Sequence, residues 1–270
     1  MTRCKPLLGT YVEITAKANL QKGIKEKNLS AIIEKAFDGM NHIEKVMSFH
    51  RPDSELSEIN AISHLKPIRI NPLLRQVLKI AQEIYVWSDG LFNCGIGQHL
   101  LHPKSPCILY GGIQDIQFNK EQAVYSSKPI CIDLGGIAKG FAVDHAVNTL
   151  QDFGIESGCV NAGGDLKVFG DFTKPIYIRC PQSPKALIEM GVLQNGAIAT
   201  TGCYPYSSHY PSCGQLINPL SGERALSIGS FSVIACDCTY ADALTKVFTL
   251  SKNRNHPCFK RFQAVPIWIN

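Results

Sequence analysis

Residues 132–140 read IDLGGIAKG, a short apolar stretch that leads into a glycine-rich turn and then into a helical pattern. Glycines let the backbone approach a ligand closely, and the N–H groups at the start of a helix attract anions. The stretch lacks both the Gly-Lys-Ser/Thr ending of a Walker loop and the GxGxxG spacing. It is therefore either an anion-binding turn, which we expect to hold a phosphate-bearing ligand, or a tight strand–helix connection that needs small residues.

Strands and helices alternate irregularly on both sides of this turn. Helical spacing of apolar residues predicts helices over residues 30–47, 72–89, 136–150 and 239–251, with Asn71 and Thr239 as N-caps and a further short helix or capped turn at 53–60. Alternation and β-branched residues predict strands over 10–16, 130–134, 157–170, 175–179, 196–200, 230–236 and 262–269, and a hairpin over 116–125. Neither a linker nor a repeat divides the chain. We expect an α+β fold of mixed sheets and packed helices, as one domain over residues 1–270 or as two closely packed halves.

Composition narrows the function classes. The chain has 270 residues, of which 45% are hydrophobic and 18% charged, with a net charge of +5. Its basic residues are scattered, which suits a small anionic ligand and does not indicate nucleic acid. The eleven cysteines include no CxxC pair, so we expect core thiols in a reducing compartment. Residues 1–14 hold no secretion signal, and no apolar run reaches membrane-spanning length. We therefore expect a cytoplasmic protein without membrane insertion.

Two further segments could carry chemistry. In residues 160–165, VNAGGD, two glycines between Asn161 and Asp165 form either an amide-exposing turn or an ordinary hairpin turn. In the helix predicted over 239–251, Asp242 and Thr245 share a face and could bind a hard cation such as Mg²⁺. Lys246 follows Asp242 by four residues, so a simple i,i+4 salt bridge is the alternative.

The order of these segments is more specific than any one of them. LGT at 8–10, MSFHRPDSELSEIN at 47–60 and SDGLFN at 88–93 precede IDLGGIAKGFAVD at 132–144. VNAGGDLKVFG at 160–170, AIATTG at 197–202, LINPLSGE at 216–223 and ADALTK at 241–246 follow it. From Arg3 to about Leu250 the chain resembles the ApbE family, the FAD:protein FMN transferases.

This resemblance implies an α+β fold with FAD in a cleft, and a Mg²⁺-dependent transferase. Such an enzyme cuts the FAD pyrophosphate, attaches FMN to a Thr or Ser of a partner flavoprotein subunit and releases AMP. Two alternatives stay open, namely a FAD pyrophosphatase that yields FMN and AMP, and a non-catalytic FAD-binding protein. A monomer or a homodimer fits each of them.

The resemblance also assigns roles to individual residues. FAD contacts are implied at Leu8, His50, Leu91, Phe92, Asn93, Asp133, Lys139 and Leu216. Metal contacts are implied at Gly136 through its carbonyl, and at Asp242 and Thr245, which are also the implied catalytic residues.

Two departures from the family pattern bear on the implied chemistry. Lys246 stands where the family usually has a Thr beside its metal, so a lysine ammonium would either repel the cation or act as a fixed positive charge on the phosphates. Gln215 stands where the family has a His that serves as base toward the acceptor hydroxyl, and glutamine cannot serve as a base. His209 is near in sequence and is a candidate substitute.

Overall fold

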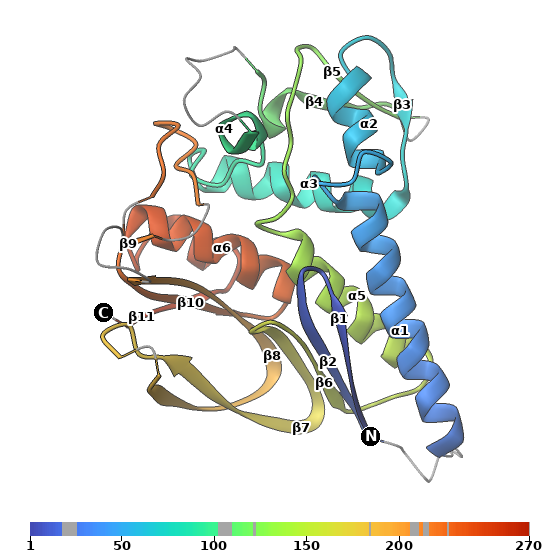
Figure 1. Ribbon diagram of the computed structural model, residues 1–270, viewed down its shortest axis with the longest axis vertical. Helices are drawn as coiled ribbons and strands as arrows, with labels where there is room; N and C mark the ends of the chain where they lie inside the picture. The colour runs from blue at the N-terminus through green and yellow to red at the C-terminus, as the bar shows by residue number, and fades with distance from the viewer. Residues whose placement is uncertain are drawn as a thin grey trace.

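The computed structural model describes residues 1–17, 26–101, 110–120, 123–183, 185–205, 211–212, 216–225 and 227–269. A large antiparallel sheet forms the base of the molecule, and helices cover one of its faces (Figure 1). Its strands, in spatial order, are β1 (Thr2–Leu7), β2 (Thr10–Ala16), β6 (Gly158–Ala162), β7 (Asp165–Arg179), β8 (Leu187–Pro205), β10 (Gly229–Ala235) and β11 (Val265–Ile269), with β9 (Pro211–Ser212) paired to β8. This mixture of helices and sheets confirms the predicted α+β class.

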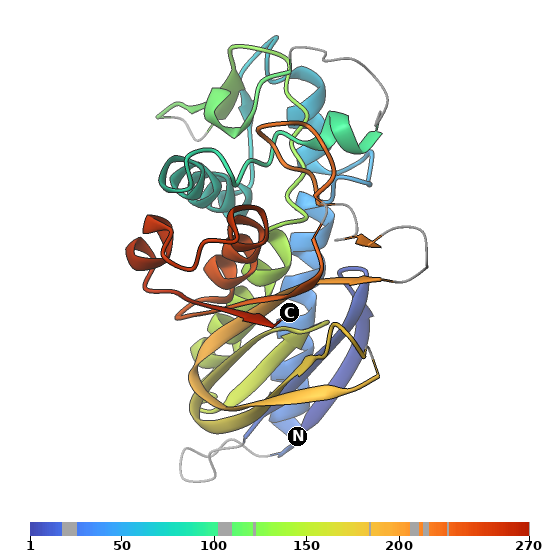
Figure 2. The ribbon, with the colours of Figure 1, turned by 90° about the vertical axis from the view of Figure 1, so that its left-hand side faces the viewer.

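Three helices lie over this sheet. Helix α5 (Ala138–Asp152) packs on β6 and β7, α6 (Cys238–Ser251) packs on β8 and β10, and α1 (Glu26–Met47) lies along the outer side of α5 (Figures 1 and 2). On the opposite face of the sheet, β6, β7 and β8 enclose a second, smaller apolar cluster that includes Val168, Ile178 and Ile198. The sheet is therefore apolar on both faces near its centre.

A smaller layer lies beyond the helices, farthest from the large sheet (Figure 1). It consists of α2 (Glu55–Ile62), α3 (Pro72–Trp87), α4 (Gly97–Leu101), the short 3-10 helix η2 (Ile113–Asp115), and a sheet of order β3 (Ile68–Arg69), β5 (Ala123–Ser126), β4 (Ile116–Phe118). Helix α7 (Pro257–Arg261) lies beside α6 and leads into β11 (Figure 2). Two helices of the smaller layer, α2 and α3, begin where local signals predicted, whereas α4 and η2 were not predicted. The Asn71 side chain accepts the Leu73 N–H at 2.9 Å ahead of Pro72, and Ser54 accepts the Ser57 N–H at 3.0 Å.

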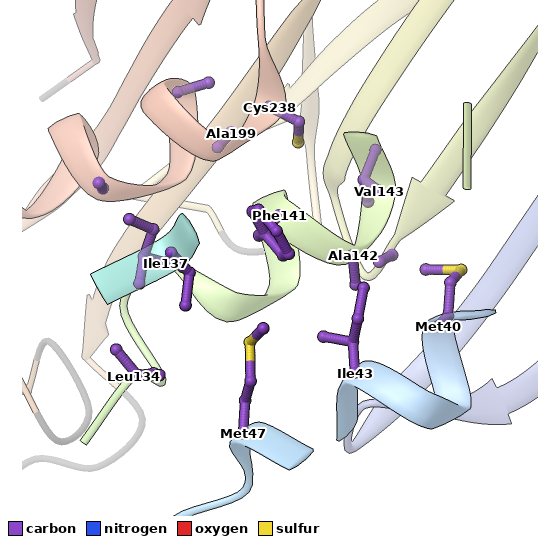
Figure 3. Packing of buried hydrophobic residues seen from close by; sticks show 14 of the residues in the cluster. Met40, Ile43, Met47, Leu134, Ile137, Phe141, Ala142, Val143, Ala199 and Cys238 are labelled. Carbon is purple, nitrogen blue, oxygen red and sulfur yellow. The ribbon is translucent and has the colours of Figure 1, made fainter. Parts of the chain in front are cut away.

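The main core lies where α1, α5 and α6 meet. Met40, Ile43 and Met47 of α1 face Phe141 and its neighbours on α5, with Cys238 of α6 on the far side (Figure 3). These side chains are almost fully buried. Because α5 begins directly after the glycine-rich turn, this packing fixes the turn against the body of the protein.

Helices α5 and α6 touch at Gly140. The Gly140 N–H donates to Oδ2 of Asp242 at 3.1 Å, and a methyl group added at Gly140 would lie 2.3 Å from the carbonyl oxygen of Cys238. Only glycine allows so close an approach. The glycine of the predicted anion-binding turn therefore serves helix packing as well.

Replacing Gly140 by Ala should lower the free energy of unfolding by about 1–3 kcal/mol, because overpacking would push α6 away from α5. Chemical denaturation of the purified variant measures this change. Gly136→Ala is the matched control, because the nearest atom to its added methyl group would be 3.5 Å away. Equal stability of the two variants would contradict the close-packing argument.

The start of α6 differs from the prediction. Its N-cap is Asp237, whereas Thr239 lies in the first turn, so the predicted N-cap is wrong by two residues. The backbone N–H groups at the start of α6 find their acceptor on α5. The Asp144 carboxylate accepts the N–H groups of Cys238 at 3.0 Å and of Thr239 at 2.8 Å. Lys167 of β7 donates to the same carboxylate at 2.9 Å. A capping residue nearly a hundred positions away cannot be recognised from local sequence.

Other predicted elements need correction. The segment predicted as a strand over 130–134 forms only an isolated bridge between Gly111 and Ile130. The final strand begins at Val265, because residues 257–261 form α7. The strand–turn–strand predicted over 157–170 is β6, the turn at Gly163 and Gly164, and the start of β7. The strand predicted over 175–179 is the continuation of β7, and the strand predicted over 196–200 is part of the longer β8, with register shifts between β7 and β8.

Eight described cysteines are free, as predicted, and Cys203 is disulfide-bonded, which the sequence did not predict. Among the helices of the described residues, none has the length and apolar character needed to cross a membrane.

Candidate functional site

Two cavities flank the turn that precedes α5, and Asp133 and Gly135 line both of them. The smaller has a volume of about 250 Å³ and the larger about 570 Å³. Since α5 begins at Ala138, the positive end of its dipole lies near their shared wall. A ligand with an anionic centre and two larger ends would fit this arrangement.

The smaller cavity gathers the sequence-predicted residues Leu91, Phe92, Asn93 and Leu216. Its wall also includes Gly136, Thr201, Ile217 and Lys246. Phe92 is almost fully buried and offers an apolar surface. The Asn93 side chain braces the wall, because its Oδ1 accepts the N–H groups of Gly95 at 2.8 Å and of Ile113 at 3.2 Å.

The larger cavity gathers Leu8, His50 and Lys139. Leu8 adopts a left-handed backbone conformation with φ of 55°, and its N–H donates to the Glu44 carboxylate at 3.1 Å. This bond ties the β1–β2 turn to α1, so the turn forms a fixed edge of the cavity. Asp133, on the shared wall, accepts the Gly135 N–H at 2.9 Å. Burial raises the pKa of Asp133, and the Gly135 N–H and the nearby His50 offset only part of that effect.

Four charged side chains meet behind the turn. Lys139 forms an ion pair with Asp165, at the start of β7, and its Nζ is 4.0 Å from Oδ2 of Asp242. Lys246 forms an ion pair with Oδ1 of Asp242, and its Nζ also donates to the Asp242 carbonyl oxygen at 2.9 Å. The two lysines and two aspartates balance one another in charge.

Asp242 is completely buried, and burial alone would raise its pKa. The positive charges of Lys139 and Lys246, together with the bonds from Lys246 and the Gly140 N–H, outweigh burial and lower the pKa of Asp242. Burial lowers the pKa of Lys139, but the negative charges of Asp242 and Asp165 raise it by more, so the net shift is upward. The carboxylate of Asp242 is thus ionised and fully compensated by protein groups.

The residues expected to hold Mg²⁺ do not fit that ion as they are arranged. Mg²⁺ requires six oxygen ligands in near-ideal octahedral geometry. Here the Lys246 ammonium takes both Oδ1 and the carbonyl oxygen of Asp242. The buried Thr245 hydroxyl donates to the same carbonyl at 2.7 Å and lies 2.7 Å from the Thr201 hydroxyl. The i,i+4 salt bridge between Asp242 and Lys246, the alternative that the sequence left open, is the observed arrangement.

The sequence assigned residues that line each of the two cavities, but it gave no role to some residues that line or adjoin them. Asp165 was recognised only as part of a turn, although it pairs with Lys139. Thr201 was noted only as part of the AIATTG motif, without a role, although it lines the smaller cavity and contacts Thr245. Gln215 and His209, the two residues considered for the base, lie outside the described residues.

The chain is similar to known proteins in sequence and in fold. The chain is 30% identical over 239 residues to the FAD:protein FMN transferase of Chlamydia trachomatis, covering 80% of this chain and 74% of that protein. The Chlamydia muridarum FAD:protein FMN transferase is 29% identical over 266 residues, covering 90% and 79%. The solved structure of the flavin transferase ApbE from Vibrio cholerae superposes with a TM-score of 0.80 at 22% identity, covering 99% and 92%, and so shares this fold. The model of the ApbE family matches residues 8–262. The chain therefore belongs to the ApbE family.

Proposed function

We propose that this chain is a transferase that moves FMN from FAD to a hydroxyl group of a Thr or Ser in an acceptor protein and releases AMP. The names of its relatives support the transfer of FMN from FAD to a protein. The observation that carries the proposal for this chain is the pair of cavities that meet at Asp133 and Gly135. FAD likewise has two bulky halves joined by an anionic pyrophosphate.

The turn and the two lysines supply what a pyrophosphate needs. Lys139 lines the larger cavity and Lys246 the smaller, so a pyrophosphate at the shared wall would lie between two ammonium groups. The N-terminal end of α5 adds a partial positive charge at the same place. In the proposal, Leu91, Phe92 and Leu216 form an apolar surface for one half of FAD, and Leu8 and His50 contact the other half.

The proposed step is a displacement at phosphorus. The acceptor hydroxyl oxygen forms a bond to the phosphorus of the FMN half, and the bond from that phosphorus to the bridging oxygen breaks. The bridging oxygen leaves with AMP, and the hydroxyl proton is released to solvent. Negative charge grows on the bridging oxygen as it leaves, so nearby ammonium groups stabilise this transition state more than the ground state.

A direct test incubates the protein with FAD and the total protein of its own cells. A flavin-fluorescent band should appear in a denaturing gel, because the phosphoester link survives denaturation, and AMP should appear in equal amount. FMN and AMP without a labelled protein would instead identify a pyrophosphatase. FAD that stays intact while bound would identify a non-catalytic protein.

The proposal extends to the setting of the enzyme. We expect residues 1–270 to work as one catalytic domain, as a monomer or a homodimer, in the cytoplasm. The eight free cysteines among the described residues support a reducing compartment. The disulfide at Cys203 is an observation against it, because disulfides persist mainly in oxidising compartments.

A further inference from the structure

The Lys246 ammonium lies where several oxygen atoms of α6 converge. It donates to the Asp242 carbonyl at 2.9 Å and forms an ion pair with Oδ1 of the same residue, while the Thr245 hydroxyl also contacts that carbonyl at 2.7 Å. A carboxylate, a carbonyl and a hydroxyl are the ligand types that a hard cation prefers. A positive charge belonging to the chain itself already occupies this position.

We propose that Lys246 is a built-in replacement for a divalent metal ion, so that this chain binds and cleaves FAD without Mg²⁺. The inference rests on the proposed function, whose chemistry requires a cation beside the pyrophosphate. It concerns which cation acts there.

Lys246 is held in place along its whole length. Its Cγ and Cε lie 3.8 Å and 3.6 Å from the point where Gly136 would carry a methyl group, so the side chain runs past the turn before α5. The side chain is 19% exposed, and it lines the smaller cavity. An ammonium has three N–H donors, and Asp242 uses two of them. Within the described residues the third N–H has no acceptor, and it can donate to a phosphate oxygen of a ligand in that cavity.

The charges around Lys246 oppose the binding of an additional metal ion. Lys139, Lys246, Asp165 and Asp242 already sum to zero, and Oδ2 of Asp242 accepts the Gly140 N–H while lying 4.0 Å from the Lys139 ammonium. A divalent ion on Asp242 would have to displace one ammonium and would lie close to the other. Lys246 instead provides a single positive charge that is covalently attached and always present.

The replacement keeps the reaction balanced. The phosphorus–oxygen bond to the acceptor forms as the bond to the AMP oxygen breaks, and the acceptor proton goes to solvent. Lys246 contributes only its charge and a hydrogen bond to the phosphate oxygens. The reaction consumes neither an oxidant nor a metal.

The first test measures Mn²⁺ binding by the loss of the electron paramagnetic resonance signal of the free ion. Wild-type protein saturated with FAD should remove no more Mn²⁺ than FAD alone does. Stoichiometric uptake by the wild-type complex would overturn the proposal. Because this measurement needs no variant and no turnover, it decides the role of Lys246 even if no acceptor is labelled.

The second test uses Lys246→Thr, which exchanges the ammonium for a hydroxyl oxygen that a metal can use. With a chelator present, FAD should bind to wild type with an affinity within about twofold of that in Mg²⁺, whereas the variant should bind at least about tenfold more weakly in chelator than in Mg²⁺. Flavin fluorescence measures both affinities. Lys260→Thr, an exposed residue of α7, is the control and should behave as wild type.

Protein labelling should show the same pattern and separates the two proposals. Wild type should label its acceptor equally in chelator and in Mg²⁺, and Lys246→Thr should label it only in Mg²⁺. Labelling by wild type that requires Mg²⁺ would overturn the role of Lys246 while supporting the transferase. The absence of labelling under every condition would overturn the transferase, and Mn²⁺ binding would still decide the role of Lys246.

Discussion

Replacing Asp242 by Asn should reduce FMN transfer by about 100- to 1,000-fold, the cost of removing one preorganised electrostatic group from an active site. The carboxylate holds Lys246 through Oδ1 and the Gly140 N–H through Oδ2, so it fixes the ammonium relative to the turn before α5. An amide has no charge, so Lys246 would lose its ion pair and keep only hydrogen bonds to neutral oxygens, among them the backbone carbonyl of residue 242. Labelling of cellular protein by fluorescent flavin measures the loss.

The affinity for FAD should not fall in this variant, because removal of a negative charge beside the pyrophosphate does not weaken anion binding. Flavin fluorescence titration tests this separately from turnover. Asp171→Asn, at an exposed position on β7, is the control and should transfer FMN at the wild-type rate. Wild-type turnover by Asp242→Asn would contradict the role assigned to this carboxylate.

Replacing Asp144 by Ala should lower the free energy of unfolding by at least about 1–3 kcal/mol, the cost of leaving one buried hydrogen-bond donor unsatisfied. The nearly buried Asp144 carboxylate accepts two N–H groups at the start of α6 and the Lys167 ammonium at 2.9 Å. The Thr239 hydroxyl donates to the same carboxylate. Alanine would remove the acceptor of the two N–H groups and of this hydroxyl, whereas Lys167 would keep its ion pair with Asp237. Urea denaturation monitored by circular dichroism measures the change.

Asp152→Ala is the matched control, because Asp152 is an exposed aspartate at the last position of the same helix. The free energy of unfolding of this control should stay within about 0.5 kcal/mol of the wild-type value, as is usual for surface substitutions. If the two variants were equally stable, Asp144 could not be what holds the start of α6.

Helices whose signals lie within their own sequence were predicted well. Asn71 and Pro72 mark the start of α3, and the stripe of Leu74, Val77 and Leu78 is buried as its spacing indicates. The start of α6 was placed wrongly because its donors are satisfied by Asp144 of α5, which only the tertiary fold brings near. The length of β7 and β8 was also missed, since pairing through register shifts depends on the partner strand and not on local propensity.

In the candidate site, too, the features that depend on the tertiary fold could not be predicted from the sequence. The order of the motifs assigned Leu8, Phe92, Asp133 and the other FAD contacts, and the structure brings them to the walls of two adjoining cavities. These assignments stay predictions until a ligand is bound. Local helix geometry was enough to offer the Asp242–Lys246 salt bridge as an alternative. It could not show that Lys139 and Asp165 complete the charge balance, because β7 and α5 meet only in the folded chain.

Under the proposed function, the wall shared by the two cavities would also affect how the products leave after cleavage. If the bond that breaks lies above Asp133 and Gly135, AMP separates into one compartment and the flavin half into the other. Each fragment then keeps only its own contacts and loses the advantage of being tethered to a second bound group. Fragments that are individually weak ligands leave readily, so the division of the site into two compartments favours turnover over product inhibition.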